Sequence, residues 1–221
     1  MKISEIEEIK EYTGKIYDQF LQGKCTVLLA EKGKFFLSNR SNNLSDISAI
    51  KKVSDYGLSP VFWVGDSQIL QSFVEFNSAP LNLSELTLLM KKIHSNQKGG
   101  LALIHGDFSR WNTVKYSEKA KCFDYEYCNW GNLYVDLGRV ILRECKSEKE
   151  ANLLLENYFG YTPKVEDLRE GLITFCQRQY EMRHEKNQSF QEIPKLRIER
   201  LLKSNLKIEE ILRAFKEEIK I

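Results

Sequence analysis

The chain has 221 residues, of which 42% are hydrophobic, and a formal net charge of +2 at neutral pH. This size can form one large domain or two small lobes with an adequate core. The small net charge gives no general attraction to nucleic acid or to an anionic membrane, so we expect neither as a partner.

The cysteines and the N-terminal residues bear on whether the protein is secreted, zinc-binding or membrane-spanning. Five Cys without a C-x-x-C pair predict neither a disulfide framework nor a zinc site. The first residues are acidic and amphipathic, and no apolar run approaches the roughly 18 residues of a membrane span. We therefore expect no signal peptide and no membrane span, and we predict a cytoplasmic protein.

Residues 1–76 are predicted to form a small lobe around an antiparallel sheet. Apolar residues at helical spacing predict a helix from residue 4 to about residue 22, with Gly14 as a weak point. A short helix is expected over 45–53, after polar residues suited to capping. Four apolar runs, separated by turn residues, are predicted to be strands: 25–30, 34–38, 60–64 and 68–74.

Residues 77–221 are predicted to form a larger, mainly helical lobe. The spacing of apolar residues predicts a helix over 83–94 with one buried face. A short strand, a loop and a hairpin should follow over 101–124, and helices thereafter, with breaks near 160–163 and 193–194. The last stretch, 196–219, mixes basic and acidic residues, which indicates a solvated face rather than a membrane or nucleic-acid patch. The predicted fold class is α+β with two lobes.

The residues able to carry chemistry are concentrated in two short segments, 105–112 and 123–126. Phosphoryl transfer needs a carboxylate near the acceptor hydroxyl, and an Asn with a second carboxylate to hold Mg²⁺. Asp107 is the candidate catalytic base, and Asn112 and Asp124 are the candidate Mg²⁺ ligands. The hairpin should bring all three to the same end of the lobe.

These motifs resemble those of a known superfamily. His-Gly-Asp-x-x-x-x-Asn at 105–112, followed by Phe-Asp-Tyr-Glu at 123–126, is similar to the aminoglycoside phosphotransferase and choline kinase superfamily of protein-kinase-like small-molecule kinases. The segment 134–139 resembles the Asp-Leu-Gly segment that follows in that group. The resemblance covers roughly residues 58–140. It implies a bilobal kinase-like fold, ATP and Mg²⁺ as cofactors, and transfer of the γ-phosphoryl group to a small-molecule hydroxyl.

The resemblance also suggests roles around these motifs. His105 is expected to brace the loop by hydrogen bonding, and Asp136 to anchor it through backbone amides or a neighbouring basic group. Glu126 is a candidate for the metal shell or for the substrate. Arg110 either neutralises the transferring phosphate, or contacts an anionic acceptor, or is merely solvated. Trp111 is expected to pack against the loop.

The first lobe departs from the family pattern. Family members usually carry a Lys or Arg on the third strand, paired with a Glu of the next helix, whereas this chain has Ser38 there and no Glu over 45–53. Arg40, two residues on, shares the strand face if the strand continues. No Gly-rich loop is present in this lobe. Arg40 or a nearby Lys would therefore hold the phosphates, or nucleotide binding would be weak. Adenine is expected against 71–75, at the backbone of Ser72 and Val74.

The acceptor and the activity are left open by the sequence. Two interpretations of the aromatic residues after position 126 stay open, a cage for a quaternary ammonium such as choline and a plain core role. A sugar or an aminoglycoside is an equal rival as the acceptor. The principal hypothesis is an active kinase. The alternative is a catalytically weak or inactive kinase-fold protein with a binding or regulatory role. The sequence sets no oligomeric state.

Overall fold

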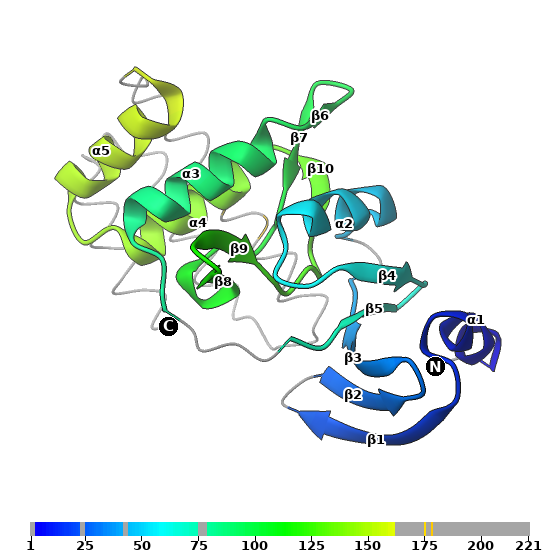
Figure 1. Cartoon of the computed structure of the whole chain (residues 1–221). Coiled ribbons are helices and arrows are strands. Elements are labelled where there is room, and N and C mark those ends of the chain that lie inside the picture. The colour runs from blue at the N-terminus through cyan, green and yellow to red at the C-terminus, as the bar shows by residue number, and fades with distance from the viewer. Residues whose placement is uncertain are drawn as a thin grey trace, which may run out of the picture.

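The computed structural model describes residues 3–22, 25–41, 44–74, 79–161, 175 and 178. These residues form a small sheet-based lobe and a larger lobe in which helices lie side by side, as Figure 1 shows. The predicted α+β, two-lobed fold class is confirmed. The predicted division after residue 76 falls between described segments and stays a prediction. None of the described helices is long and apolar enough to cross a membrane.

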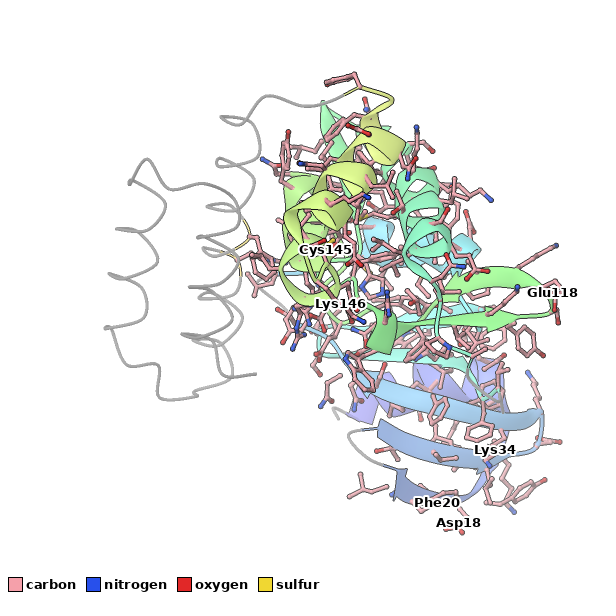
Figure 2. All side chains as sticks on the ribbon, turned by 90° about the vertical axis from the view of Figure 1, so that its left-hand side faces the viewer. Asp18, Phe20, Lys34, Glu118, Cys145 and Lys146 are labelled. Atoms are coloured by element: carbon pink, nitrogen blue, oxygen red, sulfur yellow. The ribbon has the colours of Figure 1, made fainter. Side chains whose placement is uncertain are left out.

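The first lobe contains a five-stranded antiparallel sheet. Its strand order is β1-β2-β3-β5-β4, so β3 lies at the centre and β1 at one edge. Figure 2 shows Asp18 and Phe20 on this outer edge. Helix α1 precedes the sheet, and helix α2 lies between the sheet and the second lobe (Figure 1). The bounds are α1 Ile3–Thr13, β1 Ile16–Gln22, β2 Cys25–Ala30, β3 Gly33–Asn39, α2 Ile47–Val53, β4 Val61–Val64 and β5 Gln68–Ser72.

The two faces of this sheet pack against different parts of the chain. On one face, Phe35 and Leu37 of β3 form a cluster with Ile9 of α1. Trp63 of β4 belongs to the same cluster, and its Nε1 donates a hydrogen bond to Glu8 Oε2 at 2.7 Å. On the other face, Ile69 joins the main core of the protein. Helix α1 therefore covers the face of the sheet that points away from the second lobe.

The predicted helix over 4–22 is wrong in its second half. The helix ends at Thr13, and Gly14 has φ +70°, which reverses the chain before β1 begins at Ile16. Residues 16–22 have their apolar residues at 16, 17, 20 and 21, which is a helical spacing when the segment is read alone. Pairing with β2 supplies backbone hydrogen bonds from another part of the chain, and this long-range contribution decides for the strand.

The second lobe begins with helix α3, Leu83–His94, whose predicted bounds are confirmed. Asn82 and Glu85 form a capping box at its start, which satisfies backbone donors that the first turn leaves free. The remaining elements are β6 Gln97–Lys98, β7 Leu101–Ile104, η2 Arg110–Asn112, β8 Thr113–Tyr116, β9 Lys119–Cys122, β10 Asn129–Gly131, α4 Tyr134–Glu144 and α5 Glu148–Phe159; a further 3-10 helix, η1 Ser54–Tyr56, precedes β4.

The hairpin predicted after the loop is formed by β8 and β9. Its turn residues Ser117 and Glu118 both have positive φ, the conformation of the two-residue turn that matches strand twist. Figure 2 shows Glu118 at the tip of this hairpin, pointing away from the body of the protein. A second small sheet, in the order β10-β7-β6, was not predicted. It places β7, which leads into the loop at 105–112, beside β10, which follows the segment 123–126.

Helix α5 ends at Phe159, and the next residue, Gly160, has φ +80°, so the predicted break begins there. The predicted break near 193–194 and the helix over 196–219 lie outside the described residues.

Candidate active site

Asp136 anchors the loop that carries the candidate base. It lies in the first turn of α4 and is fully buried. Its Oδ2 accepts a hydrogen bond from the backbone N–H of His105 at 2.8 Å, and its Oδ1 accepts one from Gly106 N–H at 2.9 Å. Burial raises the pKa of Asp136, but the hydrogen bond and charge of His94 and the contacts with His105 hold that pKa below its ordinary value. Asp136 is therefore an ionised anchor.

Two buried side chains, His94 and Tyr158, form a hydrogen-bonded series that ends at Asp136. His94, the last residue of α3, places Nε2 at 3.0 Å from Asp136 Oδ2 and Nδ1 at 2.7 Å from the hydroxyl of Tyr158. Since the carboxylate can only accept, the Nε2–H of His94 donates to Asp136. Helices α3, α4 and α5 are thus tied together at the loop, and His94 has a structural contact there.

Gly106 allows the loop to turn within the core. Its φ of +80° lies in the region that glycine adopts without strain. A Cβ at this position would come within 2.3 Å of the backbone oxygen of Tyr127. The glycine is required both by the turn and by the close approach of the segment that follows Asp124.

Asp107 and Asn112 form one unit. The Nδ2 of Asn112 donates to the backbone oxygen of Asp107 at 2.8 Å and to its Oδ2 at 2.9 Å. The short helix η2 closes the five-residue interval between the two side chains. Because Nδ2 of Asn112 donates to Asp107, Oδ1 of Asn112 points away from that carboxylate. An amide oxygen must be oriented in this way to bind a cation.

The other oxygen of Asp107 is paired with Arg139. The guanidinium of Arg139, one turn after Asp136 on α4, forms an ion pair with Asp107 Oδ1. The side chain of Arg139 is 8% exposed and that of Asp107 is 15% exposed. The sequence reading missed Arg139, although its position three residues after Asp136 on a helix places it on the same side. The candidate base is thus held between an amide and a guanidinium.

His105 makes two contacts with its ring. Its Nε2 donates to the backbone oxygen of Phe123 at 2.9 Å, and its ring meets Phe108 edge to face at 5.8 Å. Within the described residues no donor reaches its Nδ1. Burial is the largest influence and lowers the pKa of His105, so the ring is neutral at physiological pH. His105 therefore links the loop to the segment that precedes Asp124.

Asp124 follows the hairpin in an unusual backbone conformation. Its φ is +67°, a region that few residues other than glycine adopt and that Asp tolerates better than most. The backbone N–H of Phe123, immediately before it, donates to Asn112 O at 3.0 Å. The structure thus joins the backbones that carry Asn112 and Asp124. Strain of this kind is common where a side chain must be aimed at a ligand.

The polar groups at this end fit a cation only in part. Within the described residues, no group of three or more His, Cys, Asp or Glu side chains is arranged to hold a metal ion. Asn112 and Asp124 supply two oxygens of the kind Mg²⁺ prefers, and nucleotide phosphates with water commonly complete such a shell. The donor set fits a metal that is bound together with a phosphate substrate.

Arg110 and Glu126 lie beside this centre. Arg110 Nε lies 3.2 Å from Glu144 Oε2, and its backbone N–H donates to Glu144 Oε1 at 3.2 Å. The backbone oxygen of Glu126 accepts from Ser41 N–H at 3.1 Å, which ties the second motif to the segment after β3. Trp111 does not pack against the loop as predicted, because 81% of its surface is exposed.

In the first lobe, the position where the family carries a Lys or Arg belongs to a row of neutral polar side chains, formed by Ser38, Gln71 and Ser59. Ser38 is buried on β3, and Gln71 on β5 places Nε2 at 3.5 Å from the Ser38 hydroxyl. Ser59 in turn donates to Gln71 Oε1 at 3.3 Å. Helix α2 carries two Lys and no Glu. No Lys–Glu pair of the family type occurs between β3 and α2.

The candidate nucleotide contacts are placed as follows. Arg40 donates from Nε to the Ser45 hydroxyl at 2.9 Å and from Nη1 to Gly65 O at 2.7 Å, so part of its guanidinium is already engaged. Ser72 ends β5, and Val74 follows it in the segment predicted to face adenine. These three assignments stay predictions.

Comparison with known proteins was made by sequence and by structure. No protein-family model matches the chain, and no curated protein matches its sequence. Solved structures do match. The choline kinase LicA from Streptococcus pneumoniae has 9% identity and a TM-score of 0.59, over 98% of this chain and 97% of that one.

Two further structures agree over nearly the whole chain. A choline/ethanolamine kinase family protein from Mesorhizobium loti has 14% identity and a TM-score of 0.56, over 98% of this chain and 100% of that one. An aminoglycoside phosphotransferase from Alicyclobacillus acidocaldarius has 10% identity and a TM-score of 0.52, over 96% and 95%. The fold of the chain is therefore similar to that of the choline kinase and aminoglycoside phosphotransferase structures.

Proposed function

We propose that the chain is an ATP- and Mg²⁺-dependent phosphotransferase that moves the γ-phosphoryl group to a hydroxyl of a small molecule. The observation that carries the proposal is the unit of Asp107 and Asn112, held on a loop anchored by Asp136 and joined by a backbone hydrogen bond to the segment of Asp124. The fold supports it, since the similar structures are kinases, and LicA has also been solved with AMP.

In the proposed reaction Asp107 orients the acceptor hydroxyl and takes its proton. The hydroxyl oxygen bonds to the γ-phosphorus, the bond from that phosphorus to the bridging oxygen breaks, and ADP leaves. A carboxylate suffices as base because proton transfer comes late in a loose transition state. The hydrogen bond from Asn112 fixes the carboxylate in place while the reaction occurs.

Asn112 and Asp124 would hold Mg²⁺ with oxygens of the nucleotide. The ion, when bound, neutralises charge on the phosphate oxygens. Adenine would lie against 71–75 at the backbone of Ser72 and Val74, and Arg40 would reach the phosphates with the donors that Ser45 and Gly65 leave available. The acceptor would be an amino alcohol such as choline or ethanolamine, a sugar or an aminoglycoside.

Calorimetric titration of ATP, with and without Mg²⁺, tests the nucleotide and metal sites together. Native protein should bind ATP only with Mg²⁺, and Asp124→Ala should lose that binding. Asp55→Ala is the matched control, because Asp55 is an exposed carboxylate paired with Lys52 on the helical segment before β4. Binding that is unchanged in Asp124→Ala would contradict the metal assignment. Transfer of radiolabelled phosphate to an acceptor panel then measures activity.

A kinase-fold protein with a binding or regulatory role is the second candidate. The neutral row at Ser38 and the absence of a Glu on α2 favour it, since the usual phosphate grip is missing. Arg40→Met separates the candidates, with Lys51→Met as an exposed control. A loss of roughly 10- to 150-fold in Mg·ATP affinity would support Arg40 as the phosphate cation, because a charge-assisted hydrogen bond contributes about 1.5–3 kcal/mol. No binding by native protein at millimolar ATP would favour the second candidate.

A further inference from the structure

A buried tyrosine connects the candidate metal ligand Asp124 with the first lobe. Tyr125 follows Asp124 directly and is fully buried. Its hydroxyl donates a hydrogen bond to Cys122 O at 3.1 Å and lies 3.5 Å from Ser59 O. Ser59 belongs to the segment between η1 and β4. The side chain of Tyr125 therefore extends from the second motif to the backbone that leads into the first-lobe sheet.

The carbonyl of Cys122 is bound by the same segment. The backbone N–H of Leu58 donates to Cys122 O at 2.8 Å, and Gly57 pairs with Cys122 in an isolated parallel bridge. Figure 1 shows the end of β9 beside the stretch that joins α2 to β4. One carbonyl thus accepts from Leu58 and from the hydroxyl of Tyr125, so a shift of the segment 57–59 also changes the position of Tyr125.

The space for the Tyr125 hydroxyl depends on Gly57. A Cβ at Gly57 would lie 1.9 Å from Tyr125 Oη. The φ of Gly57 is −80°, a value that any residue adopts. The glycine is therefore required by the close approach of the hydroxyl and not by its own backbone conformation.

Hydrogen bonds hold the backbone on both sides of Asp124. After it, the backbone oxygen of Tyr125 accepts from Cys128 N–H at 3.1 Å, so Tyr125 is held at its main chain and at its hydroxyl. Before it, the backbone N–H and oxygen of Phe123 are both hydrogen-bonded to the loop at 105–112. Asp124 itself is partly exposed and has φ +67°, a conformation that persists only where neighbouring contacts enforce it. Tyr125 supplies such contacts.

We propose that Tyr125 is a positioning residue for the metal ligand: its hydroxyl, held by Cys122 O and the segment 57–59, keeps the carboxylate of Asp124 in the orientation that binds Mg²⁺. The inference rests on the proposed phosphotransferase function, because it needs a metal at Asp124. Mg²⁺ demands near-ideal octahedral geometry, whereas Ca²⁺ accepts larger and more variable oxygen shells. A misplaced carboxylate therefore weakens Mg²⁺ binding more than Ca²⁺ binding, and a general loss of stability does not.

Calorimetric titration of Mg·ATP and of Ca·ATP into Tyr125→Phe tests the proposal. The variant keeps the ring and removes the hydroxyl. We expect the affinity for Mg·ATP to fall about 3- to 10-fold, as for the loss of one neutral hydrogen bond, and that for Ca·ATP by less than about twofold. Tyr116→Phe removes the hydroxyl of an exposed Tyr on β8 and should bind both complexes like the native chain. Ile9→Ala weakens the packing of α1 on the far face of the sheet and should keep the native ratio of the two affinities.

Gly57→Ala perturbs the same hydroxyl from the opposite side. Its Cβ displaces Tyr125 Oη, so the affinity for Mg·ATP should again fall more than that for Ca·ATP. In the double variant with Tyr125→Phe, the loss should be smaller than the product of the two single losses, because both changes act on one contact. A loss equal to that product would overturn the proposed link between the segment 57–59 and Tyr125.

Amide hydrogen exchange tests the positioning in protein without metal or nucleotide. In Tyr125→Phe, the amides of Phe123 and Cys128, which lie on either side of Asp124, should exchange about 3- to 10-fold faster than in the native chain. The amide of Lys115, which donates to Ala79 O, should exchange at its native rate. Native rates at Phe123 and Cys128 would overturn the proposal.

The outcomes separate this inference from the function on which it rests. Native protein that does not bind Mg·ATP would contradict the phosphotransferase function, and the exchange rates would then still decide whether Tyr125 holds the segment of Asp124. Where the native chain binds Mg·ATP, a native affinity in Tyr125→Phe would overturn the positioning role alone. Equal losses for Mg·ATP and Ca·ATP would overturn it as well. Circular dichroism checks that Tyr125→Phe folds, and if it does not, the two affinities of Gly57→Ala decide.

Discussion

Replacing Asp136 by Asn tests whether this carboxylate holds the catalytic loop in place. The side chain is fully buried and accepts three hydrogen bonds, two at Oδ2 and one at Oδ1. An Asn amide nitrogen cannot accept, so its least costly orientation leaves the N–H of Gly106 unpaired. That loss amounts to about 1–3 kcal/mol. The two remaining bonds fall from charge-assisted to neutral strength, at about 1 kcal/mol each.

We therefore expect Asp136→Asn to lower the free energy of unfolding by about 3–5 kcal/mol, in line with other broken buried charge networks. This is a large part of the roughly 5–15 kcal/mol that stabilises a domain. With a urea slope near 2 kcal/mol/M, the midpoint should fall by about 2 M. Urea titration followed by far-UV circular dichroism measures it.

Asp55→Asn is the matched control for this experiment. Asp55 is an exposed carboxylate whose partner, Lys52, is also exposed, so its midpoint should match that of the native chain. A midpoint for Asp136→Asn within error of the Asp55→Asn value would refute the anchoring role. An unchanged slope in all three proteins would show that the same transition is being compared.

Three further predictions concern the loop, its pH dependence and the N-terminal helix. Gly106→Ala should cost about 3 kcal/mol or more, because its Cβ would meet Tyr127 O at 2.3 Å, whereas Gly160→Ala, at the same φ of +80° in open space, should cost about 1 kcal/mol; equal urea midpoints would contradict the close approach. Since the folded-state pKa of His105 is lowered from 6.5, the unfolded chain binds more protons below that pH, and stability should fall as pH drops through 6.5, by up to about 1.4 kcal/mol per unit. His105→Gln should show a shallower fall between pH 7 and pH 5, and a parallel fall would exclude a neutral buried His105. Ile9→Ala should lower the free energy of unfolding, measured by urea titration, by about 2–5 kcal/mol if α1 is packed on the sheet. A change below about 0.5 kcal/mol would contradict that packing.

The elements that the sequence predicted best are those fixed by local rules. Helix α3 begins after an Asn with a Glu three residues later and keeps one apolar face, so its bounds follow from neighbouring residues. The β8–β9 hairpin was likewise expected from two short runs around a turn. The prediction of a helix over 4–22 failed because the apolar residues of 16–22 have a helical spacing, and only pairing with β2 makes this segment a strand.

The candidate site also combines features that the sequence predicted with features that only long-range contacts decided. Asp107, Asn112 and Asp124 were named from residue types and spacing, because phosphoryl transfer restricts which groups serve it, and Asp136 was named from the resemblance. Their roles in a reaction stay predictions. Arg139 escaped notice because an Arg on a helix is ordinarily solvated, and nothing in the spacing says that it is buried against Asp107.

The sequence by itself determined the order of the motifs and the α+β class, and it predicted the kind of chemistry, since these depend on residue identity and short-range pattern. Tertiary structure alone decided that Asp136 binds the backbone of His105 and Gly106, thirty residues away, and that Arg139 meets Asp107. It also decided that Ser38 lies in a neutral buried row. Such contacts join residues distant in the chain, and their strength depends on burial, which no local pattern encodes.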